Sequence, residues 1–267
     1  MTAKHILMGI ATTVLGCTPA ADEAALPTRV AVHWGYEGEE SPAHWAELSP
    51  AFALCAEGTH QSPIDLTAPD TVEAIEVTRD YKPASLRVVR KEHVVDVLDN
   101  GHTIQVNYDQ GSTLTLEGTE YELLQYHFHM PSEHTVDGRH AALELHLVHR
   151  SDAGELAVIG VLVDEGEYNA VIAPLVDALP AEPGDTVQLE HGTFDVDGLI
   201  PFDPRYYRYE GSLTTPPCTE GVQWLVMVRQ GHASAEQLAR FAAVMPENNR
   251  PVQPRNARRL VIDVAQE

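Results

Sequence analysis

Short runs of alternating hydrophobic and polar residues recur along most of the chain, with the two-residue period of β-strands. Runs rich in β-branched residues lie at 86–90, 93–98, 103–108 and 112–116. Asn100-Gly101 and Glu117-Gly118 supply turns beside them. The runs at 157–163 and 222–228 are almost wholly hydrophobic, as expected of central strands buried on both faces. The pattern predicts a mostly β protein.

Two stretches have the character of helices, at 168–178 and 234–244. In the second, Ser234 is the expected N-cap, and Gln237 stands at the capping-box position three residues later. No linker divides the chain after its first residues, so we expect a single domain over 29–267 with a few short peripheral helices.

The N-terminal segment has the character of a bacterial export signal. A hydrophobic run at 6–16 follows Lys4 and is too short to span a membrane. The sequence Val14-Leu15-Gly16-Cys17 resembles a lipobox, which predicts a lipoprotein signal peptide at 1–17, lipidation of Cys17 and a disordered tether at 18–28. The alternative is an ordinary secretory signal that is cleaved nearby. We expect a periplasmic or cell-surface protein that meets the membrane only through a lipid anchor.

The cysteines agree with export. Of the three in the chain, lipidation of Cys17 leaves Cys55 and Cys218. These two should form a disulfide in an oxidising compartment, whereas two unrelated buried thiols are the alternative.

Acidic residues outnumber basic ones by 40 to 17, which gives a formal net charge of −23. Nucleic acids and anionic lipid surfaces attract basic proteins, so the charge argues against both as partners. An acidic surface also keeps a protein soluble. The sequence does not indicate an oligomeric state.

Three histidines fall within two of the strand-like runs. His127 and His129 are two residues apart and share one face of a strand, while Tyr126 and Phe128 face the opposite way. His146 lies in the next run, on the same face as Glu144. If the two runs pair, the three imidazoles converge. Three histidines with an open fourth position are the ligand set of a catalytic zinc. Ordinary buried polar side chains are the alternative.

Several separate segments resemble the α-class carbonic anhydrases, in the order found in that family. They are His33-Trp34-Gly35-Tyr36, Gln61-Ser62-Pro63-Ile64-Asp65, Asn100-Gly101-His102, 127–129, 132–137, 144–149, 211–217 and 248–251. The resemblance implies a large, mainly antiparallel, twisted central sheet. It also implies a lyase that hydrates carbon dioxide reversibly to bicarbonate and a proton by means of a zinc-bound hydroxide.

The same resemblance implies roles for individual residues. His127, His129 and His146 bind zinc, and Gln125, Glu144 and Asn248 support these ligands. Thr214 and Glu133 orient the hydroxide, and His102 shuttles the proton through water ordered by Tyr36, Asn100 and Gln105. The substrate pocket consists of Val148, Val158, Leu213, Thr215, Val222 and Trp224. Sulfonamides and small anions are expected inhibitors. No catalytic part is expected for His134 or His149.

Two other functions compete with this interpretation. A cupin-like metalloenzyme would use His127 and His129 together with Glu133 as ligands, with iron or manganese favoured. The glycine expected before His127 in that motif is absent, because 121–126 contains none. A non-catalytic binding module on the carbonic anhydrase fold is the second alternative, although such relatives usually lose a zinc ligand and all three are present here.

Overall fold

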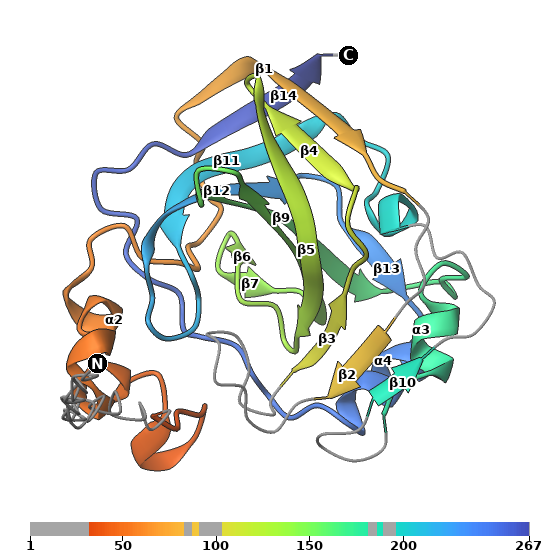
Figure 1. Cartoon of the computed structure of the whole chain (residues 1–267), viewed down its shortest axis with the longest axis horizontal. Helices are drawn as coiled ribbons and strands as arrows, with labels where there is room; N and C mark the ends of the chain where they lie inside the picture. Colours follow the sequence, from red (N-terminus) through yellow and green to blue (C-terminus); the bar gives the residue numbers. More distant parts are fainter. Residues whose placement is uncertain (1–31, 83–86, 91–102, 181–185, 189–195, 267) are drawn as a thin grey trace, which may run out of the picture. The chain divides into compact units, whose positions relative to one another are not determined.

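One large twelve-stranded sheet organises the protein, as the computed structural model shows (Figure 1). The structure describes residues 32–82, 87–90, 103–180, 186–188 and 196–266. Residues Val32–Glu267 form one compact unit. The predicted strand at 93–98, the predicted signal peptide with Cys17 and the predicted tether lie outside the described residues. No helix among the described residues is long and hydrophobic enough to cross a membrane.

The described strands are short to medium in length. They are β1 (Thr71–Asp80), β2 (Arg87–Arg90), β3 (Ile104–Asn107), β4 (Thr113–Leu116), β5 (Thr119–His129), β6 (Thr135–Val136), β7 (Arg139–His140), β8 (Leu143–Ser151), β9 (Leu156–Glu165), β10 (Thr186–Gln188), β11 (Arg205–Ser212), β12 (Glu220–Met227), β13 (Gly231–Ala233) and β14 (Val261–Gln266). β6 and β7 form a separate two-stranded sheet.

The large sheet is mixed. Its strands follow the order β10-β2-β3-β5-β4-β1-β14-β11-β12-β9-β13, and β8 pairs with both β5 and β9. Most pairs are antiparallel, but β1 with β14, β12 with β9 and β13 with β9 are parallel. The predictions of a mostly β fold and a large sheet are therefore confirmed, and the parallel pairs qualify the expected antiparallel arrangement. Figure 1 shows that the sheet curves round in a barrel-like way.

The two histidine-bearing runs do pair, which is the condition on which convergence of the three imidazoles depended. β5 and β8 are antiparallel neighbours, with His127 directly opposite His146 and His129 opposite Glu144. Tyr126 and Phe128 point to the other face, where both are buried in the main hydrophobic core. The alternation of the sequence thus directs the imidazoles to one face of the sheet and the aromatic rings to the other.

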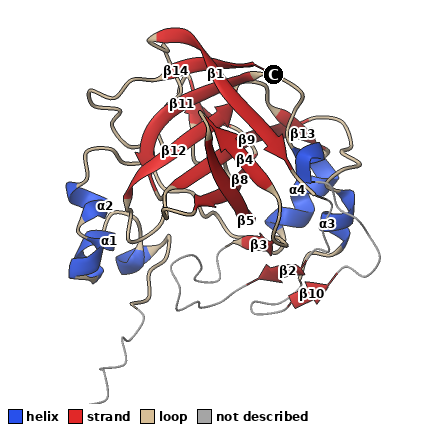
Figure 2. Ribbon diagram, turned by 45° about the horizontal axis from the view of Figure 1, so that its top comes forward, coloured by secondary structure: helices blue, strands red, loops and turns tan. Residues whose placement is uncertain are grey.

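The helices are short and lie at the edges of the sheet (Figure 2). They are α1 (Trp45–Leu48), α2 (Leu54–Glu57), α3 (Ala173–Asp177) and α4 (Ala235–Ala242), with 3₁₀ turns η1 (Gly38–Glu40), η2 (Pro50–Phe52) and η3 (Val196–Leu199). α4 begins after Ser234, which forms the predicted capping box with Gln237. Its Phe241 packs on Phe128 beneath the sheet, with ring centroids 4.9 Å apart.

The helix expected over 168–178 is shorter than predicted. α3 begins only at Ala173, with a proline in its first turn. The Asn169 side chain accepts hydrogen bonds from the backbone N–H groups of Val171, at 2.9 Å, and Ile172, at 3.4 Å. These bonds hold a turn where the helix was expected, since asparagine competes for nearby backbone donors.

A disulfide joins Cys55 in α2 to Cys218, as predicted. It crosses 163 residues of sequence, with the two Cα atoms 5.1 Å apart. Both cysteines pack with Trp34 and Trp45 in a small hydrophobic cluster. The bond therefore attaches the N-terminal helical segment to the loop that follows β11.

Candidate metal centre

The three histidines predicted as ligands meet on one face of β5 and β8. One ring nitrogen from each of His127, His129 and His146 lies within 4.8 Å of the others. The exposed fractions of His127, His129 and His146 are 9%, 1% and 1%. Gly160 of β9 lies opposite His146, and a β-carbon there would come within 3.3 Å of Glu144 Oε1. The absence of a side chain at Gly160 therefore leaves room for the Glu144 carboxylate beside His146.

Each imidazole is oriented by a hydrogen bond from its second nitrogen. His127 Nδ1 lies 2.9 Å from Gln125 Oε1, and His129 Nδ1 lies 2.8 Å from the carbonyl oxygen of Asn248. His146 Nε2 lies 2.8 Å from Glu144 Oε1. All three acceptors require an N–H donor, so Nε2 of the first two rings and Nδ1 of the third are left as bases.

Glu144 is the centre of a buried polar network. Its Oε2 accepts the backbone N–H groups of Glu133 and His134, both at 2.8 Å. Its Oε1 accepts from His146 and also from His134 Nδ1, at 2.7 Å. Burial by itself would raise the pKa of Glu144, but His134 and His146 outweigh it and hold that pKa well below its usual range. The carboxylate is therefore charged, and His134 has the structural part expected of it.

The electrostatics of the cluster favour neutral imidazoles. Burial lowers the pKa of His127 well below its usual value, and the neighbouring His129 lowers it further. Burial also lowers the pKa of His129, to about 4, and that of His146. Neutral imidazole is the form that binds a metal ion, so the rings are ready as ligands at neutral pH.

Glu133 and Thr214 adjoin the free ring nitrogens. Glu133 Oε2 lies 3.5 Å from His129 Nε2 and 3.9 Å from His146 Nδ1, while its Oε1 accepts the backbone N–H of Arg250 at 2.9 Å. Burial raises the pKa of Glu133 to about 7, although His146, the Arg250 N–H and the Thr214 hydroxyl each act to lower it. The hydroxyl of Thr214 therefore faces the buried carboxyl group of Glu133.

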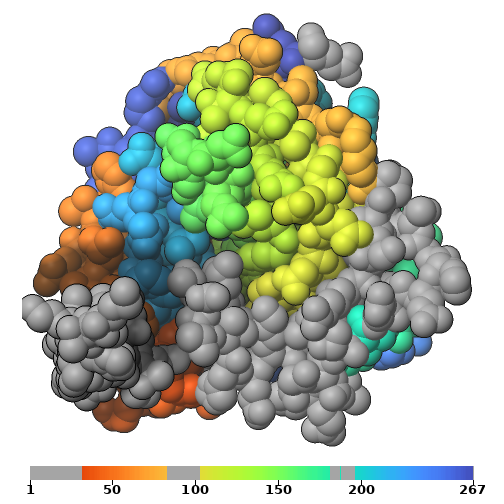
Figure 3. Space-filling model, in the orientation of Figure 1, coloured from red at the N-terminus to blue at the C-terminus, as the bar shows by residue number. Residues whose placement is uncertain are grey.

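The loop segment around Glu133 is fixed from outside the cluster. Asp65 Oδ1 accepts the Thr135 hydroxyl at 2.6 Å and the Gly138 N–H at 2.8 Å, which anchors the β6–β7 hairpin. In Figure 3 the bright green segment that contains this hairpin lies at the surface. Residues of the Gln-Ser-Pro-Ile-Asp segment thus hold the chain immediately after Glu133.

The predicted substrate pocket forms a hydrophobic wall beside the histidines. Val148, Val158, Val222 and Trp224 are buried in one cluster, and Leu213 packs against it. The Trp224 ring lies 4.8 Å from that of His146, and its N–H donates to the Ser212 carbonyl oxygen at 3.0 Å. Thr215 is buried in the same loop as Thr214.

The residues predicted for proton transfer are described only in part. Gln105 of β3 lies directly opposite His127, on the metal-facing side of the sheet. Tyr36 packs edge-on against Trp34 and Trp45. Its ring centroid lies 5.8 Å from that of each tryptophan. Asn100 and His102 lie outside the described residues.

The cluster fits a divalent transition metal. It offers three neutral nitrogen donors at suitable spacing, each with its second nitrogen occupied. His129 Nε2 and Glu133 Oε2 are buried atoms without a hydrogen-bond partner among the described residues. Such atoms are costly unless a ligand or water satisfies them, so they indicate that something binds here.

The sequence and fold were compared with those of known proteins. The family model for eukaryotic-type carbonic anhydrases matches residues 40–263. The chain belongs to the α-carbonic anhydrase family. A carbonic anhydrase of Nostoc is 41% identical over 265 residues, which is 97% of either chain. One from Neisseria gonorrhoeae is 44% identical over 228 residues, with 85% of this chain and 86% of the relative covered.

A solved carbonic anhydrase structure agrees with these matches. The enzyme of Thermovibrio ammonificans, in complex with the inhibitor sulfanilamide, superposes with a TM-score of 0.79. It is 41% identical, and the match covers 86% of this chain and 99% of that one. The α-carbonic anhydrases are lyases, so the chain is an enzyme, and its family indicates hydration of carbon dioxide. The cupin-like and non-catalytic alternatives are set aside.

Two residues with places in this carbonic anhydrase site had no role in the sequence prediction. Arg250 supplies the N–H that binds Glu133, and its guanidinium donates to the carbonyl oxygens of Cys55 and Ser62. Asn107 accepts a hydrogen bond from Gln105. Asn107 could have been found, because it is two residues from Gln105 in one strand. Nothing local in the sequence identifies the backbone contact of Arg250.

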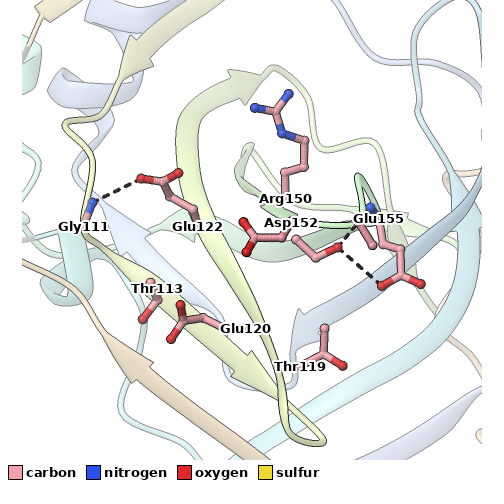
Figure 4. Close-up of a pocket in the computed structure, with 10 residues that line it drawn as sticks. Gly111, Thr113, Thr119, Glu120, Glu122, Arg150, Asp152 and Glu155 are labelled. Atoms are coloured by element: carbon pink, nitrogen blue, oxygen red, sulfur yellow. Dashed lines mark hydrogen bonds between the residues drawn. The ribbon is translucent and has the colours of Figure 1, made fainter.

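A separate cavity of about 530 Å³ lies at the opposite end of β5 and β8 (Figure 4). Glu120, Glu122, Arg150, Asp152 and Glu155 are among its lining residues. Glu122 accepts a hydrogen bond from the Gly111 N–H at 3.3 Å. Within the described parts of the chain, these acidic residues do not belong to any group of side chains placed closely enough to hold a metal.

Proposed function

We propose that the protein hydrates carbon dioxide reversibly to bicarbonate and a proton, with a zinc ion held by His127, His129 and His146. The observation that carries this proposal is the set of three free ring nitrogens within 4.8 Å, each fixed by a bond from the opposite side of its ring. Zinc in such a site supplies a Lewis acid that makes a water molecule acidic enough to act as a nucleophile at neutral pH.

Thr214 and Glu133 orient the attacking oxygen. A hydroxyl that donates its proton to a carboxylate has only lone pairs left for its other neighbours. Thr214 therefore accepts a hydrogen bond from the nucleophile and fixes which lone pair of that oxygen faces the substrate. A nearby divalent cation favours the charged form of Glu133, which this arrangement requires. The backbone N–H of Thr214 suits an oxygen of bicarbonate or of an inhibitory anion.

The hydrophobic wall holds carbon dioxide itself. The substrate carries no charge and no hydrogen-bond donor, so Val148, Val222 and Trp224 offer it a hydrophobic surface that water binds only weakly. The proton leaves by way of water near Gln105 toward His102, whose imidazole has a suitable intrinsic pKa for a shuttle. Sulfonamides and small anions are expected to inhibit, as sulfanilamide binds the Thermovibrio enzyme.

The experiment combines activity with metal content. Carbon dioxide hydration by the purified protein is followed with a pH indicator, and bound zinc is measured in the same sample. One zinc per chain and rapid hydration are expected, with both lost after treatment with a chelator and both restored by added zinc. Inhibition by sulfanilamide completes the test. Bound zinc without hydration, or hydration unaffected by metal removal, would contradict the proposal.

We also propose that the chain is exported, with 1–17 as a signal peptide, lipid on Cys17, 18–28 as a tether and 29–267 as the enzyme domain. The Cys55–Cys218 disulfide supports an oxidising compartment. The test is to express the full chain and Cys17→Ser in a bacterium that is fed a labelled fatty acid. We expect label and membrane association only with Cys17, and an unlabelled wild-type chain would exclude the anchor.

A further inference from the structure

An unusual group of side-chain amides lies beside the candidate zinc ligands. β3 and β5 are antiparallel neighbours, with Gln105 opposite His127 and Asn107 opposite Gln125. Residues directly opposite one another in a sheet project to the same face. All four side chains therefore lie on the metal-facing side, and Gln105 and Gln125 are diagonal neighbours within it.

The hydrogen bonds determine which end of each glutamine amide is free. Gln105 Nε2 donates to Asn107 Oδ1 at 2.6 Å, which leaves Gln105 Oε1 as the free end of that amide. Gln125 Oε1 lies 2.9 Å from His127 Nδ1, which leaves Gln125 Nε2. One glutamine thus offers an acceptor and the other a donor, on adjacent strands of one face.

Both of these atoms are buried and unsatisfied. Gln105 and Gln125 are only 5% and 4% exposed. Gln105 Oε1 and Gln125 Nε2 have no hydrogen-bond partner within the residues that the structure describes. A buried polar atom left in that state destabilises the fold, and ordered water is its usual partner. The two atoms therefore indicate a place for a small molecule that both donates and accepts.

We propose that Asn107 is a positioning residue that holds the Gln105 carbonyl oxygen toward the metal face, where Gln105 and Gln125 together bind one water molecule of the proton path. This inference rests on the proposed carbonic anhydrase function. Asn107 touches neither substrate nor metal, and it acts only through the amide of Gln105.

The orientation of the Gln105 amide decides whether such a water can pass a proton on. A water molecule has two O–H donors and two lone pairs. Bound between an acceptor and a donor, it uses one of each, and one lone pair remains to receive a proton while one O–H remains to release one. With the Gln105 amide reversed, two N–H donors would occupy both lone pairs. The water would then have nowhere to receive an incoming proton.

The test separates proton release from carbon dioxide hydration. kcat/KM reports the steps up to bicarbonate release, whereas kcat also includes the proton transfer that regenerates the enzyme. Asn107→Leu removes the acceptor at similar volume, and Asn107→Asp retains it. The assay is run at alkaline pH, where the pH–rate profile is flat, and at low buffer concentration, so that the buffer does not carry the proton. Under these conditions Asn107→Leu should lower kcat about fivefold and change kcat/KM by less than about twofold. Excess imidazole should restore kcat, and Asn107→Asp should stay within about twofold of wild type.

A double-mutant cycle and a direct structural measurement complete the test. If Asn107 acts through Gln105, adding Asn107→Leu to Gln105→Leu changes kcat no further. A high-resolution crystal structure should show a water molecule in hydrogen-bond contact with Gln105 Oε1 and Gln125 Nε2, displaced in Asn107→Leu. An unchanged kcat in that variant, an equal fall in both kinetic constants, or the absence of the water would overturn the inference. An inactive wild-type enzyme would instead contradict the proposed function, while the crystal structure would still test the water site.

Discussion

The two ends of the β5–β8 pair both carry side chains of types that can bind a metal, histidines at one end and carboxylates at the other, and they differ in what surrounds them. At one end His127, His129 and His146 are buried, and each ring is held by a separate acceptor. At the other end, around the cavity of Figure 4, Glu120 and Arg150 are exposed to solvent. Acidic groups there make contacts of 3.3 Å or more, such as Glu122 with Gly111 and Glu155 with the Ser151 hydroxyl.

This difference shows that the type of ligand residue does not by itself make a metal site. Burial removes water as a competing partner, and the outer hydrogen bonds fix which nitrogen of each ring is free. The end around the cavity of Figure 4 is the open end of the pair, and water there solvates each carboxylate and screens its charge. Both requirements are met only where the sheet is covered, so changes at the two ends should have very unequal effects.

The largest effect is expected from removing a ligand. His129→Ala leaves two imidazoles and should lower zinc occupancy and hydration activity by at least about a hundredfold, because the remaining ligands cannot hold the ion in a fixed geometry. Metal analysis and indicator-based hydration kinetics measure the two quantities. The matched control at the open end is Glu122→Gln. A variant that kept its zinc and its activity would remove His129 from the ligand set.

Glu144→Gln should weaken zinc binding by about 10–100-fold, the usual range for a residue that holds a ligand in place. The carboxylate accepts four hydrogen bonds from Glu133, His134 and His146, and an amide must direct an N–H at some of these donors. Competition with a fluorescent chelator measures the affinity. Asp152→Asn, the same change of carboxylate to amide at the open end, serves as the control. Equal affinities in the two variants would contradict the comparison.

His149, near the C-terminal end of β8, provides a smaller effect, on stability rather than on metal. His149 stacks on Tyr81, whose hydroxyl lies 2.7 Å from its Nε2, and burial lowers the pKa of His149 to about 4. The unfolded chain, with a pKa of about 6.5, binds the proton more readily, so folding stability falls as the pH drops from about 6.5 to about 4. This contribution is present above pH 6.5 and amounts to about 3 kcal/mol.

His149→Gln should therefore flatten the fall in stability over that range. Urea unfolding of the zinc-loaded protein at several pH values measures the slope, and the difference between wild type and variant isolates His149 from the other histidines. Parallel slopes in wild type and His149→Gln would show that His149 does not cause the acid sensitivity.

The smallest effect is expected at the open end. Glu122→Gln should change the free energy of unfolding by less than about 0.5 kcal/mol, because solvent replaces its long hydrogen bond to Gly111. Zinc content and hydration should match wild type. A large loss of either would show that the cavity of Figure 4 communicates with the metal centre.

The sequence predicted those parts of the site that depend on local periodicity. The i, i+2 spacing of His127 and His129 determined their common face. Pairing with the run around His146 was a condition of the prediction, and the register of β5 and β8 meets it. The family resemblance supplied Thr214 and Glu133, which no spacing would have brought together. The parallel pairing of β1 with β14 was not predicted, because no local pattern links strands that are almost the whole domain apart.

Other misses have a similar physical origin. The start of α3 depends on the side chain of Asn169, which competes with helical hydrogen bonds. The contact of Arg250 with Glu133 is made by its backbone N–H, a group that every residue but proline possesses. The i, i+2 spacing could have placed Asn107 on the same face as Gln105, but its position opposite Gln125 depends on the register of β3 and β5. Contacts of this kind depend on tertiary placement, and residue type carries little information about them.

The position of β14 has a consequence for the order of synthesis and folding. β14 pairs with β1 on one side and β11 on the other, and it is the strand that joins these two parts of the sheet. A ribosome delivers β1 long before β14, so the first strand remains without one neighbour until residues 261–266 have been made. Pairing over such a distance slows folding. The sheet therefore cannot be completed between β1 and β11 until the last strand of the domain has been made.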